Sequence, residues 1–196
     1  MDKCAYENHK TTQGKIWHFL AHEESIQSYL VNALIVILIG KFLLFPVLGL
    51  ALGTDFPVVA VISTSMTHNE KFDDWWINNG AWYEANGITK SQFDKFYKSN
   101  GFNKGDVFVV KKIPFDELKV GDIIVYNVAE NTEPIIHRII AISVANNTLQ
   151  TKGDNNIAQI EFEKAISENQ IEGKAVGWIP VLGWVKVIFI TIAKLF

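Results

Sequence analysis

Two closely spaced serines of this 196-residue chain carry hydroxyls that could take part in nucleophilic chemistry. Ser63 and Ser65 stand two apart at the end of the apolar run 56–62. Residues two apart on an extended strand point to the same side, so both hydroxyls can face one spot. A serine attacks a carbonyl when a base takes its proton and donors stabilise the oxyanion. Ser65 is the candidate nucleophile, and a simple turn after a strand is the alternative.

Two histidines can serve as the base. His137 lies in the isoleucine-rich run 134–142, and His68 follows Ser65 by three residues. The others precede a long apolar segment that is expected to separate them from the serine: His9, His18 and His22. A lysine base would need burial to lower its pKa, and no lysine lies in an apolar strand as His137 does. We predict His137 as the base and His68 as the second candidate, with a catalytically idle core histidine as the alternative.

A carboxylate has to orient such a base. Asp154 lies in a Gly-Asp-Asn loop one hairpin after His137, and this spacing lets the loop fold back onto the histidine strand. Gly-Asp-Asn is also a common turn sequence. Asp154 is therefore a candidate third member of a Ser-His-acid arrangement, and a simple turn is again the alternative.

Composition argues against several other chemistries. The net charge is -3 and no block of basic residues is present, so the sequence lacks the electrostatic footprint of nucleic-acid binding. The single cysteine, Cys4, excludes an internal disulfide and a multi-cysteine zinc site. The histidines lack metal-binding spacing, and there is no glycine-rich phosphate loop. We expect neither a metal nor another cofactor.

Residues 29–53 are the strongest hydropathy feature of the chain. Asn32 and Lys41 are the strongly polar residues there, and roughly 20 apolar residues suffice to span a bilayer. A charge near the middle costs about 3 kcal/mol, which the many Leu, Ile, Val and Phe residues outweigh. We predict a transmembrane helix, with a buried core helix as the alternative. Pro46 predicts a kink or the outer end of the helix.

The lysines suggest an orientation for this span. Lys3, Lys10 and Lys15 precede it, whereas residues 54–70 contain neither Lys nor Arg. Positive residues favour the cytoplasmic side of a membrane. Residues 1–28 are therefore predicted to be cytoplasmic, and the domain after the span to lie on the extracytoplasmic side of the cell membrane.

Residues 54–177 alternate short apolar runs with turn residues, which predicts a mainly β domain. The predicted strands, some with a preceding turn, are 58–62, 105–110, 120–126, 134–142, 149–152 and 172–177. After them, residues 178–196 are apolar again and predict a C-terminal membrane-associated helix or a second span.

An aromatic insertion, residues 69–104, interrupts the strands. Trp, Tyr and Phe are mixed there with Asp, Asn and Lys, and the pairs Asn79-Gly80, Asn86-Gly87 and Asn100-Gly101 predict turns. Residues 91–98 predict a short helix. Two interpretations of the insertion fit this pattern: a lid that faces substrate or the membrane interface, and a small subdomain with an aromatic core.

Five short motifs follow one another along the chain. They are Ser63-Thr64-Ser65-Met66, Lys104-Gly105-Asp106-Val107, the Val-Gly-Asp-Ile-Ile-Val-Tyr run at 120–126, Ile136-His137-Arg138-Ile139, and Thr-Lys-Gly-Asp-Asn-Asn at 151–156. In this order, after a predicted membrane span, they resemble the type I signal peptidases, in particular the archaeal and endoplasmic-reticulum branch. That branch carries His where the bacterial enzymes carry a lysine base. The resemblance covers about residues 48–184.

The resemblance implies a signal-peptidase-type β-fold and a membrane-bound serine endopeptidase, signal peptidase I. Its partners would be the lipid membrane and exported pre-proteins, whose N-terminal signal peptides are cut after small residues. The resemblance also implies that Ser65 is the nucleophile, that His137 is the general base, and that Ser63 helps the Ser65 backbone N–H to form the oxyanion hole. The alternative is a non-catalytic, membrane-anchored β module that binds secreted chains.

The sequence departs from the family pattern at two places. His68 occupies a position that is usually proline, which adds a second imidazole next to the serine motif. Family members often carry a further aspartate about six residues after the Gly-Asp-Asn aspartate. Here that position is Ile160, with Glu161 and Glu163 next to it. We therefore expect Asp154, which matches the Gly-Asp-Asn aspartate, to orient the base, with Glu161 as the second candidate.

Overall fold

The structure, a computed structural model, describes residues 11–129 and 133–193. Cys4, His9 and the lysines at positions 3 and 10 lie outside the described residues. The chain divides into two compact units, Met1–Leu48 and Gly49–Phe196.

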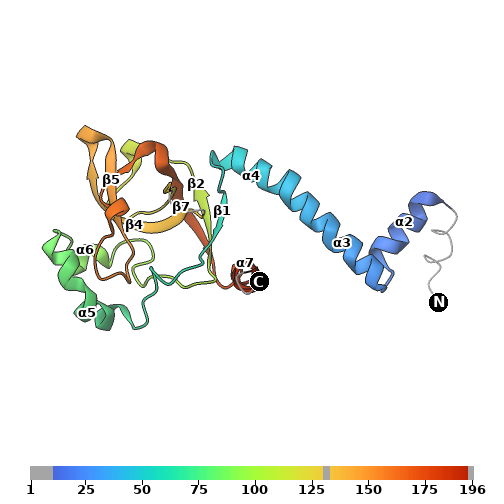
Figure 1. The fold of residues 1–196 in the computed structure, drawn as a ribbon, viewed down its shortest axis with the longest axis horizontal. Helices are drawn as coiled ribbons and strands as arrows, with labels where there is room; N and C mark the ends of the chain where they lie inside the picture. The colour runs from blue at the N-terminus through green and yellow to red at the C-terminus, as the bar shows by residue number, and fades with distance from the viewer. Residues whose placement is uncertain (1–10, 130–132, 194–196) are drawn as a thin grey trace. The chain divides into compact units, whose positions relative to one another are not determined.

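A helical hairpin forms the described part of the N-terminal unit (Figure 1). Its helices are α2 (Thr12–Ala21) and α3 (Ile26–Ile39). Thr11 and Ser25 cap their N-termini, each accepting a hydrogen bond from a backbone N–H of the first turn. The Ser28 hydroxyl donates to the Phe19 carbonyl over 2.6 Å, which links the two helices near their connection.

The second helix of the hairpin continues into a long apolar helix. It runs through η1 (Gly40–Leu44), a π-helical turn, and α4 (Phe45–Leu52). The whole helix, Ile26–Leu52, has 27 residues and a mean hydropathy of 2.5 in its most apolar window, so it is long and apolar enough to cross a membrane. That window is 0% buried, which does not fit a core helix. The π-helical turn lies just before Pro46, whose ring has no N–H for regular helical bonding.

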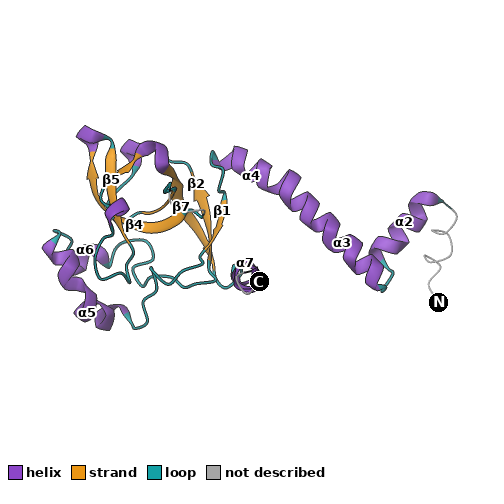
Figure 2. Ribbon diagram, viewed as in Figure 1, coloured by secondary structure: helices purple, strands orange, loops and turns teal. Residues whose placement is uncertain are grey.

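The C-terminal unit is built on one antiparallel sheet of seven strands in the order β1-β2-β7-β3-β4-β5-β6. The strands are β1 (Val58–Ala60), β2 (Val107–Lys111), β3 (Ile123–Tyr126), β4 (Ile135–Ser143), β5 (Thr148–Lys152), β6 (Ile166–Ser167) and β7 (Ile171–Ile179). Short 3-10 turns lie between them: η2 (Phe115–Glu117), η3 (Val144–Asn146), η4 (Glu161–Glu163) and η5 (Glu168–Gln170). The sheet curls on itself (Figure 2), and the mainly β fold is confirmed.

Both faces of the curled sheet are buried. In β3, Ile123 and Val125 belong to one apolar cluster, and Ile124 and Tyr126 belong to another. Side chains alternate across a strand, so a strand covered on both faces appears in the sequence as a continuous apolar run. The neighbouring strand β4 carries His137 opposite Ile124.

The aromatic insertion folds as a small helical subdomain. Its helices are α5 (Phe72–Ala85) and α6 (Lys90–Phe93), and they lie side by side (Figure 1). Trp75, Trp76, Tyr83 and Phe93 are buried together in an apolar cluster to which Ile140 of β4 also belongs. These side chains therefore form a core and are not a membrane-facing surface.

The turn predicted at Asn79-Gly80 is wrong, because both residues lie inside α5. Gly80 has a packing role there: a Cβ at this position would lie 2.4 Å from the Trp76 indole nitrogen. The short helix predicted at 91–98 is α6, which ends at Phe93 and begins after Thr89, whose side chain and that of Gln92 form a capping box.

The C-terminal helix α7 (Trp184–Ala193) has 10 residues. It begins on the sheet, where Gly183 N–H donates to the Gly105 carbonyl over 2.8 Å and Trp184 packs on the Gly105 backbone. Among residues 11–129 and 133–193, Ile26–Leu52 is the one helix that is long and apolar enough to cross a membrane. Val185 and Ile188 of α7 are exposed, and the association of this helix with a membrane stays a prediction.

Candidate active site

Ser65 and His137 lie within hydrogen-bonding distance of each other. Ser65 lies in the turn that follows β1, and His137 lies in β4. His137 Nε2 is 2.9 Å from Ser65 Oγ. The serine segment is held by the buried Met66 side chain below it and by a backbone hydrogen bond from Phe102 N–H to the Met66 carbonyl. The geometry is that of a hydroxyl ready to give its proton to an imidazole.

Ser63 contributes a second hydroxyl to the same place. Its Oγ is 3.1 Å from Ser65 Oγ, as the spacing of two residues predicts. Ser63 is exposed and Ser65 is half-buried, so both hydroxyls are accessible to a bound peptide.

Glu163 is the acid that lies against the imidazole. Its Oε1 is 2.5 Å from His137 Nδ1, and its side chain is fully buried. The carboxylate also accepts hydrogen bonds from Gly153 N–H (3.2 Å) and Ile160 N–H (2.8 Å). An ionised carboxylate is acceptor-only, so Nδ1 carries the proton and Nε2 is left to accept from Ser65.

The two acids predicted from the sequence are placed elsewhere. Asp154 is fully buried and forms hydrogen bonds with Arg138, Tyr83 and His68, while His137 contacts a different carboxylate. Glu161 is exposed and pairs with Lys164 over 2.7 Å. Glu163 stands two residues after Glu161, and η4 turns it inward while Glu161 points to solvent.

His68, the second candidate base, lies behind the serine. Its Nε2 is 3.3 Å from Asp154 Oδ2, and its ring stacks on Trp75 at 3.7 Å between centroids. The ring is fully buried and contacts an acid, whereas the Ser65 hydroxyl contacts His137.

Asp154 sits in a dense set of charged partners. Arg138 donates to it through Nη2 (2.7 Å) and Nε (3.0 Å). Burial by itself raises the pKa of the Asp154 carboxyl, but the charge of Arg138 and the hydrogen bonds from His68 and Arg138 hold that pKa well below its usual range. The carboxylate is therefore ionised at neutral pH and balances the buried guanidinium.

Replacing Asp154 with Asn is expected to lower the free energy of unfolding at pH 7 by about 3 to 5 kcal/mol, because it leaves Arg138 buried without its counter-charge. The folded pKa of Asp154 is depressed, so its stabilisation is present above about pH 4 and is lost as pH falls toward the folded pKa. Urea unfolding of both proteins from pH 7 to pH 3 measures this difference. The control is Asp73→Asn, whose exposed pair with Lys90 is worth under about 1 kcal/mol. An equal loss from both variants contradicts the prediction.

The loop 153–156 touches every member of the arrangement. Asn155 N–H donates to the Ser65 carbonyl over 2.7 Å, and its side-chain amide donates to the Thr64 carbonyl over 3.1 Å. A Cβ at Gly153 would lie 2.9 Å from His137 Nε2, so glycine is what lets the loop lie against the imidazole. The loop therefore contacts Ser65, His137 and Glu163.

Lys152, before this loop, does not reach the serine. Its Nζ donates to the Gly153 carbonyl over 3.1 Å and lies over the ring of Tyr83 at 4.8 Å. Burial lowers the pKa of Lys152 to about 8, against the opposing effect of the Asp154 and Glu163 charges.

Known proteins share part of this sequence. The signal peptidase complex catalytic subunit sec11 of Sclerotinia sclerotiorum is 38% identical over 95 residues, which cover 44% of this chain and 55% of that protein. SEC11C of Homo sapiens is 30% identical over 95 residues, which cover 44% of this chain and 50% of that protein. The resemblance to signal peptidases is confirmed. No family model matches, and the chain spans about half the length of the curated relatives it matches.

A cleft of about 510 Å³ opens beside Ser65 and His137. Most of its lining is apolar and comes from the segment around β1, from β4 and from α7: Val59, Ala60, Ile62, Ile135, Ile136 and Ile190. Glu133 at its rim pairs with Lys186 of α7 over 2.6 Å. Among the described residues, no group of three His, Cys, Asp or Glu side chains is placed to hold a metal ion. The cleft suits a short apolar peptide segment presented to Ser65.

Proposed function

We propose that this protein is a membrane-anchored serine endopeptidase that removes N-terminal signal peptides from exported pre-proteins. The observation that supports it most is the line Ser65 Oγ, His137 and Glu163, with contacts of 2.9 Å and 2.5 Å at the two imidazole nitrogens. The similarity to signal peptidase catalytic subunits supplies the substrate class.

In the proposed reaction, His137 Nε2 takes the proton of Ser65 Oγ as this oxygen attacks the scissile carbonyl. The tetrahedral intermediate collapses when the histidine gives that proton to the leaving amine, which yields an acyl-enzyme. Water then attacks the ester with the same base assisting, and Ser65 regains its proton. Glu163 fixes the imidazole tautomer and stabilises the imidazolium that forms in both steps.

The negative oxygen of the intermediate needs donors near Ser65. We assign this role to the Ser65 backbone N–H and to the Ser63 hydroxyl, which lies 3.1 Å from Ser65 Oγ. Because Ser63 Oγ is exposed on the side of the cleft, it can turn toward a bound peptide without moving the backbone.

The apolar cleft and the apolar helix Ile26–Leu52 support a reaction that takes place at a membrane. We propose that this helix anchors the protein in a membrane, with the catalytic domain on the non-cytoplasmic side, where signal peptides are cut. The relatives are named as subunits of a complex, so partner subunits are part of the proposal.

Purified full-length protein in detergent is expected to cut a pre-protein once, after a small residue, and mass spectrometry of both products locates the cut. A peptide phosphonate ending in alanine is expected to form a covalent adduct on Ser65 Oγ, mapped by tryptic mass spectrometry. An intact substrate together with no adduct, in a protein whose circular dichroism shows the β fold, contradicts the proposal and favours the non-catalytic β module.

A further inference from the structure

We propose that the aromatic insertion sets the catalytic geometry from behind the active site, with Tyr83 and His68 as positioning residues that hold Asp154 and, through it, the loop 153–156. The inference rests on the proposed function, because it concerns how the same nucleophile and acid are held. It gives the insertion a role other than that of a lid over the substrate.

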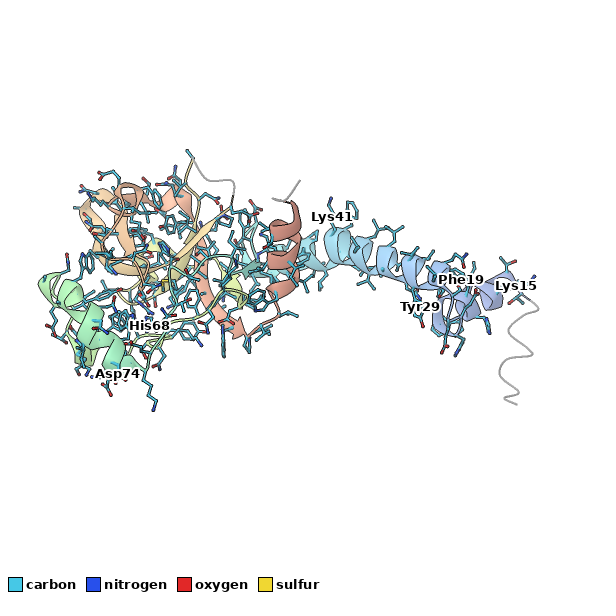
Figure 3. The ribbon with its side chains drawn as sticks, turned by 60° about the horizontal axis from the view of Figure 1, so that its bottom comes forward. Lys15, Phe19, Tyr29, Lys41, His68 and Asp74 are labelled. Atoms are coloured by element: carbon cyan, nitrogen blue, oxygen red, sulfur yellow. The ribbon has the colours of Figure 1, made fainter. Side chains whose placement is uncertain are left out.

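The first observation is how Asp154 is held. Tyr83 Oη donates to Asp154 Oδ1 over 3.0 Å, and His68 Nε2 donates to Oδ2 over 3.3 Å. Tyr83 lies in α5, and His68 lies beside the helix that carries Asp74 (Figure 3). Burial and the Asp154 charge raise the pKa of Tyr83 well above its ordinary value, so the phenol keeps the proton that it donates. Both donors belong to the insertion or to the residue just before it.

The second observation is that Asp154 is the hydrogen-bond partner of the His68 ring, whose other nitrogen has none among the described residues. His68 Nδ1 and Trp75 Nε1 are the buried side-chain polar atoms without a partner among the described residues, and the two rings stack on each other within 8° of parallel. Leaving a buried polar atom unpaired is unfavourable, because the atom loses its hydrogen bonds to water. The hydrogen bond to Asp154 and the stacking on Trp75 are the interactions that offset this cost, and together they fix the imidazole on the acid.

The third observation is where Asp154 lies relative to the reacting groups. One residue before it, Gly153 N–H donates to Glu163 Oε1, and one residue after it, Asn155 N–H donates to the Ser65 carbonyl. A displacement of the Asp154 side chain would therefore move the contacts of both the acid and the nucleophile. A displacement of the reacting groups by about 1 Å is enough to slow a reaction.

A second connection runs from the insertion to β4 through Arg138. Its Nη1 donates to the Tyr97 carbonyl over 2.8 Å and its Nη2 to the Lys98 carbonyl over 2.9 Å, while the guanidinium lies 4.8 Å from the centre of the Phe93 ring. Lys98 has a φ of +54°, a left-handed conformation that a residue other than glycine keeps only where its surroundings hold it. Arg138 is the neighbour of His137 in the strand, so the insertion is attached next to the base as well.

The insertion has no part in the substrate cleft that the structure describes. None of the residues 69–104 is in the lining of that cleft, which comes from other segments of the same unit. An effect of the insertion on catalysis is therefore expected in kcat, because the reacting groups are displaced, with KM little changed.

The test compares Tyr83→Phe, which removes one hydroxyl, with Trp76→Phe, which disturbs the same aromatic core without touching Asp154. Tyr83→Phe is expected to lower kcat by roughly tenfold, inside the 10²-fold that a 1 Å misplacement costs, with KM within about twofold. Trp76→Phe is expected to lower the melting temperature as much or more and to leave kcat unchanged. At His68, His68→Gln keeps an N–H donor and is expected to retain more of kcat than His68→Phe, which keeps only the stacking ring.

Hydrogen exchange measured by mass spectrometry supplies a readout that does not need activity. Amides of the loop 153–156 are expected to exchange faster in Tyr83→Phe and at the wild-type rate in Trp76→Phe. Equal exchange in the two variants, or a fall in kcat that only follows the loss of stability, overturns the inference. If the wild-type protein cuts no pre-protein, the proposed function fails, and the exchange rates still decide whether Tyr83 holds the loop.

Discussion

Ser65→Ala is expected to lower kcat for pre-protein cleavage by about 10⁶-fold, because no other described hydroxyl contacts His137 Nε2. The melting temperature should stay close to that of the wild type, since Ser65 is half-buried and its side chain packs no core cluster. Single-turnover cleavage with enzyme in excess over a fluorescent pre-protein can follow rates over this range.

The matched control for this variant is Thr64→Ala. Thr64 also carries a hydroxyl, but its side chain is exposed on the residue between the two serines, and its contact to the loop is made by its backbone carbonyl. Its rate should stay within a few-fold of the wild type. His137→Ala should be as slow as Ser65→Ala, and the double variant no slower, since residues that act as a unit are not additive. Cleavage by Ser65→Ala at the parent rate would show that the nucleophile is another group.

Glu163→Gln is expected to lower kcat by about 10⁴-fold with the fold intact. The amide can offer an N–H to His137 Nδ1, which favours the tautomer whose proton sits on Nε2 and cannot accept from Ser65. With the amide N–H on the side of His137, the amide oxygen still accepts from Ile160 N–H, and the weaker bond from Gly153 N–H is lost, so the turn keeps its shorter hydrogen bond.

Glu161→Gln is the matched control, because it makes the same change two residues earlier at a side chain that points to solvent. It should cleave at the wild-type rate. Glu163→Asp, which keeps the charge and shortens the reach, should fall between the two. The assignment of Glu163 is refuted if Glu161→Gln loses activity to the same degree, or if Glu163→Gln cleaves as fast as the wild type.

The mainly β fold and the contact between Ser65 and His137 could be predicted from the sequence. Short apolar runs between turn signals predicted the mainly β fold, and the lone imidazole in an isoleucine run, His137, was preferred as the base over His68. Their contact of 2.9 Å depends on the pairing of β4 within the sheet, which the pattern of the strands constrains.

The acid could not be predicted in the same way. Asp154, Glu161 and Glu163 all follow the histidine strand, and sequence spacing does not say which one faces inward. The choice depends on η4, a single 3-10 turn whose direction is set by the hydrogen bond from Ile160 N–H to Glu163. The buried ion pair between Arg138 and Asp154 could not be predicted from the sequence either. Because Asp154 pairs with Arg138, Glu163 is the acid that contacts His137.

The helix α5 was missed for a related reason. Asn79-Gly80 is a strong turn signal when only neighbouring residues are considered. In the folded chain, the missing side chain of Gly80 makes room for the Trp76 indole, which is a contact within one helix turn that no turn rule includes.

The strand order has a consequence for biosynthesis. β7, the last of the seven described strands in sequence order, lies between β2 and β3 and joins the two parts of the sheet. While residues 171–179 are still inside the ribosome, β7 is missing from the sheet. One part of the sheet then carries Ser65 and the other carries His137 and Glu163, and no strand connects the two parts. The proposed peptidase would thus be inactive until β7 inserts between β2 and β3, because only then are Ser65, His137 and Glu163 carried by one sheet.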